Sequence, residues 1–122
     1  MVYFLDTYAI IEFLKSNKAY LKYFKQRSIT SRLNLMELYY KSLRDFGKEL
    51  ADKFYSMFLT FAVDFSDDAI KEAMEFRLKM RKEGKDFSYT DAIGYIVAKK
   101  NKAKFLTGDE EFKGLPNVKF VK

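Results

Sequence analysis

The chain has 122 residues, of which 48% are hydrophobic, and 23 Lys and Arg against 17 Asp and Glu give it a formal net charge of +6. It contains no cysteine, which excludes disulfides, zinc ribbons and thiol nucleophiles, and no histidine, which removes the usual general base at neutral pH. Catalysis must therefore depend on carboxylates, hydroxyls, lysines or a bound hard metal ion, and the basic surface favours a polyanionic partner.

The composition predicts one domain over residues 1–122, because the chain holds no internal repeat, linker or low-complexity tract. No signal peptide is visible, since the N-terminus lacks a basic region and carries Asp6 in its apolar run. The longest apolar stretch, Tyr55 to Val63, is interrupted by Ser56 and Thr60 and is far too short to span a bilayer. We therefore expect a soluble, cytoplasmic protein with no membrane partner.

The first elements predicted along the chain are two strands and two helices. Val2 to Leu5 is a continuous apolar run, typical of a strand buried on both faces of a parallel sheet, and it ends at Asp6-Thr7. An amphipathic helix follows, with apolar residues from Ala9 to Leu14 on one side. A second short helix carries aromatic residues from Tyr20 to Phe24 among lysines, and Ser28 to Thr30 predicts a brief strand.

The next helix, Ser31 to Phe46, contains a carboxylate in an unexpected place. Its predicted buried stripe has the 3, 4 and 3 spacing of one helical face and consists of Leu33, Met36, Tyr40 and Leu43. Glu37 lies four positions after the start of this stripe, and therefore on it. A carboxylate directed at the core costs several kcal/mol unless it is paired, for which Arg32 or Arg44 is available, or bound to a metal.

The central part of the chain predicts two more helices. Leu50 to Phe61 forms the first, and a short strand at Ala62 to Asp64 follows it closely. Ser66 caps a long helix that continues to Gly84. Near the end of the chain, a last strand covers Val118 to Val121.

Residues 87–112 predict a helix, a basic turn, a short strand and an acidic loop. Ser88 is the expected cap, which places Asp91 in the first helical turn, where the helix dipole favours a carboxylate. The strand is Phe105 to Thr107, and the glycine after it turns the chain into Asp109. In an open α/β sheet, chemistry gathers beyond the carboxyl ends of the strands, and Asp109 would stand there.

Four carboxylates are candidates for one metal site. Asp6 and Asp109 each follow a predicted buried strand closely, so parallel strands would bring both to the same edge of the sheet. With Asp91 and Glu37 they form an oxygen-only set suited to Mg²⁺ or Mn²⁺. Without a cation such acids repel one another, and at least one is expected to have a raised pKa. Asp109→Asn is therefore expected to relieve this repulsion and to raise the melting temperature of the metal-free protein.

The same acids also have structural interpretations. An Asp after a strand is often only a helix cap, so Asp6 and Asp91 each have a structural interpretation when taken singly. Glu110 and Glu111 are better explained as a solvated acidic turn than as ligands. A polyanion's backbone would be held by basic residues, for which the candidates are Lys15, Lys18, Lys22, Lys25 and the run from Lys99 to Lys104.

Four motifs, VYFLDTYAII, LNLMELYY, SYTDAIGYIVAKK and KFLTGDEEF, occur in the order and spacing of a known family. The chain resembles the PIN-domain ribonucleases, specifically the VapC toxins of toxin–antitoxin pairs, over its whole length. The resemblance implies an α/β fold of three layers, α/β/α, with a central parallel sheet flanked by helices. It also implies that Asp6, Glu37, Asp91 and Asp109 surround Mg²⁺ or Mn²⁺.

The resemblance extends to substrate and partners. It implies hydrolysis of RNA, a cognate VapB-like antitoxin and a homodimer, and we expected the antitoxin to lie across aromatic residues of Tyr20 to Phe24 and Tyr39-Tyr40. The hydroxyl before the family's last acid matches Thr107, which would orient a ligand or phosphate. Two positions depart from the family pattern: Tyr8 replaces Ser or Asn, and Glu111 replaces Asp.

Three alternatives compete with a nuclease. A phosphatase of the haloacid dehalogenase type needs a second Asp two residues after the first, where this chain has Tyr8. A receiver domain needs paired acids at the end of the first strand. The main alternative is a catalytically inactive PIN fold that binds RNA or protein. The complete set of four acids argues against this alternative.

Overall fold

The computed structural model describes all 122 residues and consists of a four-stranded sheet surrounded by helices. The elements in chain order are β1 (Val2–Leu5), α1 (Thr7–Leu14), α2 (Lys18–Phe24), β2 (Arg27–Ile29), α3 (Arg32–Phe46), α4 (Lys48–Leu59), α5 (Asp67–Lys82), α6 (Tyr89–Lys100), β3 (Lys104–Thr107), the 3₁₀ turn η1 (Glu110–Phe112) and β4 (Val118–Phe120).

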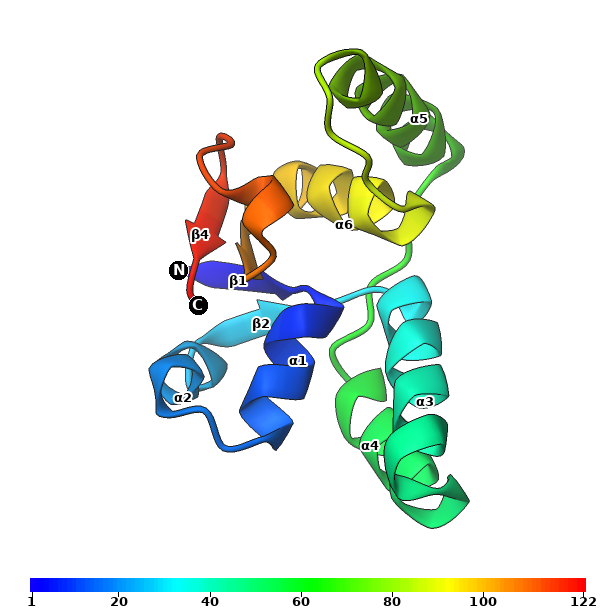
Figure 1. Ribbon diagram of the computed structural model, residues 1–122, viewed down its shortest axis with the longest axis vertical. Coiled ribbons are helices and arrows are strands. Elements are labelled where there is room, and N and C mark those ends of the chain that lie inside the picture. Colours follow the sequence, from blue (N-terminus) through cyan, green and yellow to red (C-terminus); the bar gives the residue numbers. More distant parts are fainter.

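All strands of the sheet are parallel, in the order β2-β1-β3-β4. The central strands β1 and β3 pair directly, with Phe4 opposite Phe105 and Leu5 opposite Leu106. Figure 1 shows α1 and α2 on one side of the sheet, α6 with α5 behind it on the other, and the α3–α4 hairpin beside the end of β1. The predicted three-layer α/β/α fold with a central parallel sheet is confirmed.

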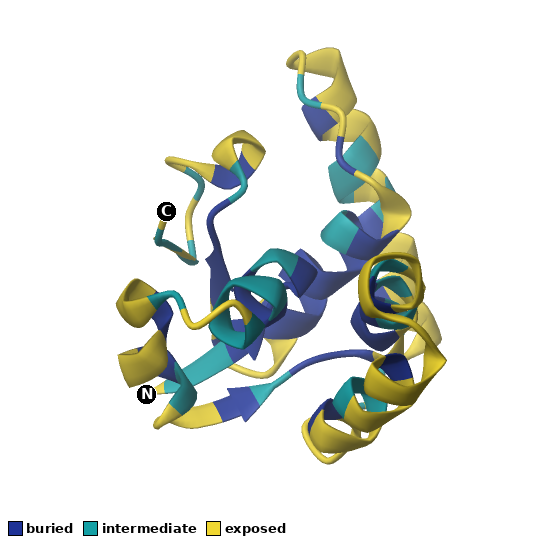
Figure 2. Ribbon diagram, turned by 60° about the horizontal axis from the view of Figure 1, so that its bottom comes forward, coloured by how far each residue is buried: buried dark blue, intermediate teal, exposed yellow.

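Alternation along the central strands divides the core between the two faces of the sheet. Phe4 and Phe105 stack on each other and pack with α5 and α6, whereas Leu5 and Leu106 pack with α1 to α4. Figure 2 shows the resulting concentration of buried residues in the central strands and in α6. Because both faces of β1 and β3 are buried, the continuous apolar runs in the sequence identify these strands correctly.

The face of α3 that packs inward differs from the predicted one. Met36 and Tyr40 are 56% and 66% exposed, whereas Leu35 and Leu38 are buried. The predicted stripe was therefore wrong: the inward face also holds Asn34 and Ser42, whose polarity conceals it from a search for apolar spacing. Glu37 is nevertheless only partly exposed, because it lies beside the buried face and close to α1.

The predicted strand at Ala62 to Asp64 does not form. Only Thr30 and Ala62 make a bridge, and the chain then continues into α5. The other elements start and end within about two residues of their predicted bounds, which is the normal uncertainty for helix ends.

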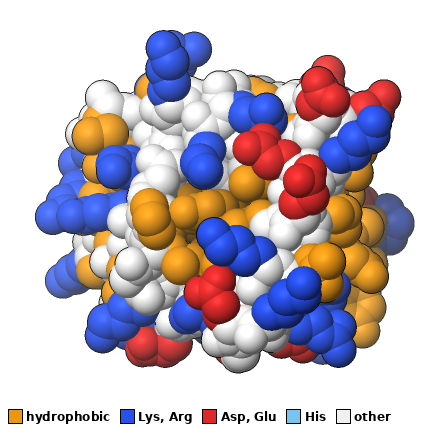
Figure 3. Space-filling view, turned by 90° about the horizontal axis from the view of Figure 1, so that it is seen from above, with side chains coloured by type: hydrophobic (Ala, Val, Ile, Leu, Met, Phe, Trp, Pro, Cys, Tyr) orange, Lys and Arg blue, Asp and Glu red, His pale blue; other side chains and the backbone are white.

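None of the helices is both long and apolar enough to cross a membrane. On the face seen in Figure 3, Lys and Arg side chains are spread more widely than Asp and Glu, and apolar side chains lie exposed between them. The excess of Lys and Arg over Asp and Glu in the sequence is thus visible on this face of the protein.

Candidate active site

Two of the predicted acids lie at the carboxyl ends of the central strands and are linked through Thr107. Asp6 directly follows β1 and is only 3% exposed, and Thr107 at the end of β3 is fully buried. The Thr107 hydroxyl donates a hydrogen bond to Asp6 Oδ2 at 2.7 Å and accepts one from the backbone N–H of Asp109 at 3.1 Å. The Thr107 hydroxyl therefore bonds the carboxylate of Asp6 and the backbone of Asp109 at the same time.

The turn that carries Asp109 requires glycine at the preceding position. A Cβ atom on Gly108 would collide with the ring of Tyr8 and would lie 2.5 Å from the carbonyl oxygen of Val121. Only glycine allows this close approach, which sets Asp109 beside Asp6. Asp109 Oδ1 also accepts a hydrogen bond from the Glu111 backbone N–H at 3.0 Å, so this carboxylate caps η1 as well.

Asp91 is brought to the same edge by the N-terminus of α6. Ser88 is the cap, as predicted: its hydroxyl accepts a hydrogen bond from the Asp91 N–H, and Asp91 Oδ2 accepts one from the Ser88 N–H, both at 3.0 Å. This reciprocal pair is a capping box, which stabilises the start of a helix. One carboxylate oxygen of Asp91 is used in the cap, and the other remains available to the site.

Glu37 is held in place from α1. Its Oε1 accepts a hydrogen bond at 2.8 Å from the hydroxyl of Thr7, which itself accepts one at 3.1 Å from the side-chain amide of Asn34. Ser31 in turn donates to Asn34 Oδ1 at 2.6 Å. These buried polar contacts fix the start of α3 against the start of α1, and with it the position of Glu37.

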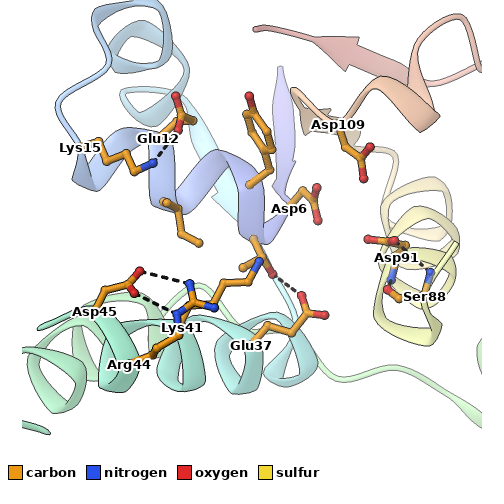
Figure 4. Close-up of a pocket in the computed structure, with 13 residues that line it drawn as sticks. Asp6, Glu12, Lys15, Glu37, Lys41, Arg44, Asp45, Ser88, Asp91 and Asp109 are labelled. Atoms are coloured by element: carbon orange, nitrogen blue, oxygen red, sulfur yellow. Dashed lines mark hydrogen bonds and ion pairs between the residues drawn. The ribbon is translucent and has the colours of Figure 1, made fainter. Parts of the chain in front are cut away.

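The four predicted acids line one cavity of about 440 Å³. Figure 4 shows that they come from separate elements: Asp6 at the end of β1, Glu37 from α3, Asp91 from α6, and Asp109 after β3. The other residues that line the cavity are Thr7, Tyr8, Ile11, Glu12, Lys15, Lys41, Arg44, Asp45 and Ser88. The structure thus brings together the complete set of acids that the sequence suggested.

Electrostatics at the site disfavour the charged state of two of these acids. Burial raises the pKa of Asp6 to about 7; the charges of Asp91 and Glu37 add to this effect, and the hydrogen bond from Thr107 opposes it. Burial also raises the pKa of Asp91, against the hydrogen bonds of Ser88, and the charges of Asp109 and Glu37 raise it further. The expectation that at least one acid has a raised pKa is confirmed for Asp6 and Asp91.

No Lys or Arg forms an ion pair with any of the four acids. The basic side chains of the cavity are either paired elsewhere or unpaired: Lys15 lies 3.7 Å from Glu12, and Arg44 binds Asp45. Neither Arg32 nor Arg44 neutralises Glu37, although both were alternative partners in the sequence. Because no basic side chain neutralises these mutually repelling carboxylates, a cation bound from solution would lower their electrostatic energy.

The donor chemistry fits Mg²⁺ or Mn²⁺, because every candidate ligand is a carboxylate oxygen and the cavity contains no histidine or cysteine. No three acids of the chain approach closely enough to enclose one ion. This open arrangement suits Mg²⁺, which commonly takes only one or two carboxylates and keeps several of its waters. The acids therefore fit a hydrated hard cation better than a closed protein cage.

Several residues that support or line the site were not predicted from the sequence. Thr7 and Asn34 support Glu37 through side-chain hydrogen bonds, and Lys41 and Arg44 line the cavity from α3. Thr7 could have been found from its place directly after Asp6. Asn34 could have been found as a polar residue one helical turn before Glu37, provided that the inward face of α3 had been assigned correctly.

Similar structures have the same fold. VapBC2 from Rickettsia felis, bound to a promoter DNA fragment, is 23% identical, with a TM-score of 0.78 over 99% of this chain and 98% of that chain. DNA-bound VapBC from Salmonella typhimurium is 20% identical, with a TM-score of 0.76 over 99% and 98%. The sarcin-ricin loop cleaving toxin VapC20 from Mycobacterium tuberculosis is 19% identical, with a TM-score of 0.70 over 98% and 99%.

No curated protein sequence matches this chain at a significant level. The PIN domain model, in contrast, matches residues 3–118 and thereby includes Asp6, Glu37, Asp91 and Asp109. The family match, the parallel sheet and the shared fold agree with the resemblance in the sequence motifs. This chain belongs to the PIN domain family.

Proposed function

We propose that residues 1–122 form one PIN-like domain that hydrolyses RNA phosphodiester bonds with a divalent metal ion, as the toxin of a VapBC-type pair. The observation that carries this proposal is the meeting of Asp6, Glu37, Asp91 and Asp109 in one cavity with no basic partner, in a chain of net charge +6. Family membership adds weight, as does the description of one similar structure as a toxin that cleaves the sarcin-ricin loop.

The four acids have two roles in this proposal: three bind the ion, and one acts on the water. Asp6, Asp91 and Asp109 hold the ion directly or through water, and Thr107 keeps Asp6 oriented. A bound Mg²⁺ or Mn²⁺ supplies Lewis acidity, which polarises a phosphoryl oxygen and lowers the pKa of the attacking water. Glu37, oriented by Thr7, aligns that water or accepts its proton, a task for which no histidine is present.

RNA cleavage is expected to depend completely on Mg²⁺ or Mn²⁺ and to stop in EDTA, because the four carboxylates repel the phosphate backbone when no cation neutralises them. The measurement is cleavage of a labelled RNA by the purified protein, with Mg²⁺, Mn²⁺, Ca²⁺ or EDTA. Cleavage that persists unchanged in EDTA would contradict a metal-dependent mechanism.

The alternative is a PIN fold that binds RNA or protein without cutting. The same assay distinguishes the two, since an inactive module would bind RNA in Mn²⁺ and leave it intact. The complete set of acids favours the enzyme, because a chain that only binds RNA gains nothing from four carboxylates that no basic side chain neutralises.

A second part of the proposal concerns protein partners. The similar structures include VapBC complexes, and we propose a VapB-like antitoxin and a homodimer for this chain as well. The expected antitoxin contact at Tyr20 to Phe24 needs revision, because Tyr20 and Tyr23 are buried in the core. A better candidate is an apolar groove between α1, α3 and α4, whose apolar lining is Ile11, Leu14, Leu38, Phe46, Leu50 and Phe54.

Light scattering of the purified chain is expected to give the mass of two copies, because Met36 and Tyr40 on the outer face of α3 are exposed. Co-expression with a small reading frame next to the gene is expected to yield a larger complex. Phe46→Glu should release that small partner, since it places a charge in the groove at a side chain that is 57% exposed. A single-chain mass, or a host extract that returns no small partner, would contradict this part of the proposal.

A further inference from the structure

The cavity that holds the acids also has a basic side, built by α1 and α3. Lys15 lines it from α1, and Lys41 and Arg44 line it from α3. Figure 4 shows Lys41 reaching from α3 into the cavity, with Glu37 on one side of it and the Arg44–Asp45 pair on the other. The same side also holds Glu12 and Asp45, which pair with Lys15 and Arg44, so its net excess of one positive charge comes from Lys41.

Lys41 is the unpaired basic residue of this group. It follows Glu37 by four positions, so the two side chains lie on the same face of α3. Its side chain is half-buried, and its ammonium group makes no ion pair or hydrogen bond in the structure. A half-buried ammonium that faces solvent within a cavity is free to bind an anion from solution.

Arg44 is already occupied. Its Nε and Nη2 donate hydrogen bonds to the two carboxylate oxygens of Asp45 at 2.9 and 3.2 Å, and this pair holds the pKa of Asp45 below its usual range. The fork of a guanidinium suits phosphate as well as carboxylate, so Asp45 competes with any phosphate that enters this side of the cavity.

We propose that Lys41, assisted by Lys15, binds a backbone phosphate of the RNA next to the scissile one, and that Asp45 limits this binding by holding Arg44. The inference rests on the proposed function, because it takes RNA as the ligand. Every nucleotide carries a phosphate, so a strand whose scissile group lies at the acids must place its neighbouring phosphates close by. The four acids repel these groups, and the lysines of the basic side attract them.

This arrangement makes Lys41 a positioning residue and gives opposite expectations for two substitutions. Lys41→Gln removes a phosphate contact, which should weaken RNA binding about tenfold and reduce the slope of log Kd against log salt by about 0.7. Asp45→Asn removes a competing carboxylate and frees Arg44, so it should tighten binding. Lys41→Arg keeps the charge and should restore most of the affinity.

The test measures the anisotropy of a fluorescein-labelled single-stranded oligouridylate in EDTA, where no cleavage is expected, at several NaCl concentrations. Lys48→Gln and Asp52→Asn are matched controls, because Lys48 and Asp52 form an exposed ion pair on α4 outside the cavity. These substitutions change the net charge by the same amounts as Lys41→Gln and Asp45→Asn. Both controls should alter the affinity by less than about twofold. Equal effects of Lys41→Gln and Lys48→Gln would overturn the inference.

Cleavage kinetics in Mn²⁺ give a second readout. Lys41→Gln is expected to raise KM with a smaller change in kcat, since the lost contact is made in the bound substrate as well as in the transition state. A fall in kcat with no change in KM or in salt slope would assign Lys41 to the chemistry and contradict a positioning role. If no variant cleaves RNA while the binding pattern holds, the proposed function fails and the phosphate site stands.

Discussion

Asp6→Asn is expected to raise the melting temperature of the metal-free protein at about pH 8 and to reduce RNA cleavage in Mn²⁺ by about a hundredfold or more. Asp6 is 3% exposed, and burial together with the charge of Asp91 raises its pKa to about 7. Its carboxylate is thus costly to ionise in the folded chain. Asn has nearly the same shape, carries no charge and can still accept the hydrogen bond from Thr107.

The sign of this effect follows from proton binding. An acid whose pKa is higher in the folded state than its ordinary value of 3.8 binds its proton more tightly when folded. Stability therefore falls as the pH rises from about 4 to about 7 and then levels off. Each pKa unit corresponds to about 1.4 kcal/mol, so the rise from 3.8 to about 7 gives a loss on the order of 4 kcal/mol for this buried group.

Metal-free wild type should accordingly melt higher at about pH 5 than at about pH 8, and Asp6→Asn should remove most of that difference. At about pH 8 the variant is expected to melt roughly 10–20 °C above wild type in EDTA. Mn²⁺ at about a hundredfold excess over its dissociation constant should stabilise wild type by about 2.7 kcal/mol, and the variant far less. Thermal melts of both proteins in EDTA and in Mn²⁺ provide the measurement.

Asp64→Asn is the matched control, because the side chain of Asp64 is 95% exposed and only pairs with Arg32 on the surface. This variant should melt within about 1 °C of wild type and keep full activity. An Asp6→Asn variant that melts below wild type in EDTA at about pH 8 would show that Asp6 is structural. Asp109→Asn, for which the sequence also predicts a higher melting temperature, should give a smaller gain than Asp6→Asn, since Asp109 is less buried and caps η1.

Asp91→Asn is expected to lower cleavage by about a hundredfold or more while changing stability little, and Ser88→Ala is expected to do the reverse. Asp91 accepts a hydrogen bond from Ser88 in the capping box, and an Asn oxygen can do the same. Ser88→Ala removes the other half of the box and should cost about 1 kcal/mol. Together the two variants separate the helix cap from the proposed ligand.

Ser66→Ala supplies the control for capping alone, since Ser66 caps α5 through the Ala69 N–H and lies outside the acid cavity. It should cost about as much stability as Ser88→Ala. Cleavage and melting should be measured for all three variants at a temperature where each is folded. If Ser88→Ala abolishes cleavage as completely as Asp91→Asn does, the role of Asp91 is to cap α6 rather than to hold an ion.

The sequence allowed most of the fold to be predicted, because the central strands are buried on both faces. Val2–Leu5 is a short apolar run directly followed by Asp6, and Phe105 and Leu106 in β3 precede Thr107, Gly108 and Asp109. Ser88 with Asp91 is a local signal that needs no tertiary contact, and the structure shows the capping box it predicts. Asp6, Asp91 and Asp109 could be found for the same reason, since each lies at an element end that local patterns identify, whereas Glu37 lies inside α3.

The inward face of α3 could not be found in this way. Its exposed side carries Met36 and Tyr40, and its buried side carries Asn34, whose polarity is satisfied only by Thr7 and Ser31 from outside the helix. A search for apolar spacing therefore selects the wrong face. The same limitation hid Lys41, because its place in the acid cavity depends on how α3 packs against α1.

The direct pairing of β1 with β3 also sets the order in which the cavity can form. The hydrogen bond between Asp6 and Thr107 joins residues 101 positions apart, and parallel pairing over such a separation is slow because a long loop must close first. On the ribosome, a nascent chain that already contains Asp6, Glu37 and Asp91 still lacks the strand that brings Asp6 and Asp109 together. A protein proposed to cleave RNA thus gains its complete acid site only after β3 and Asp109 have been translated.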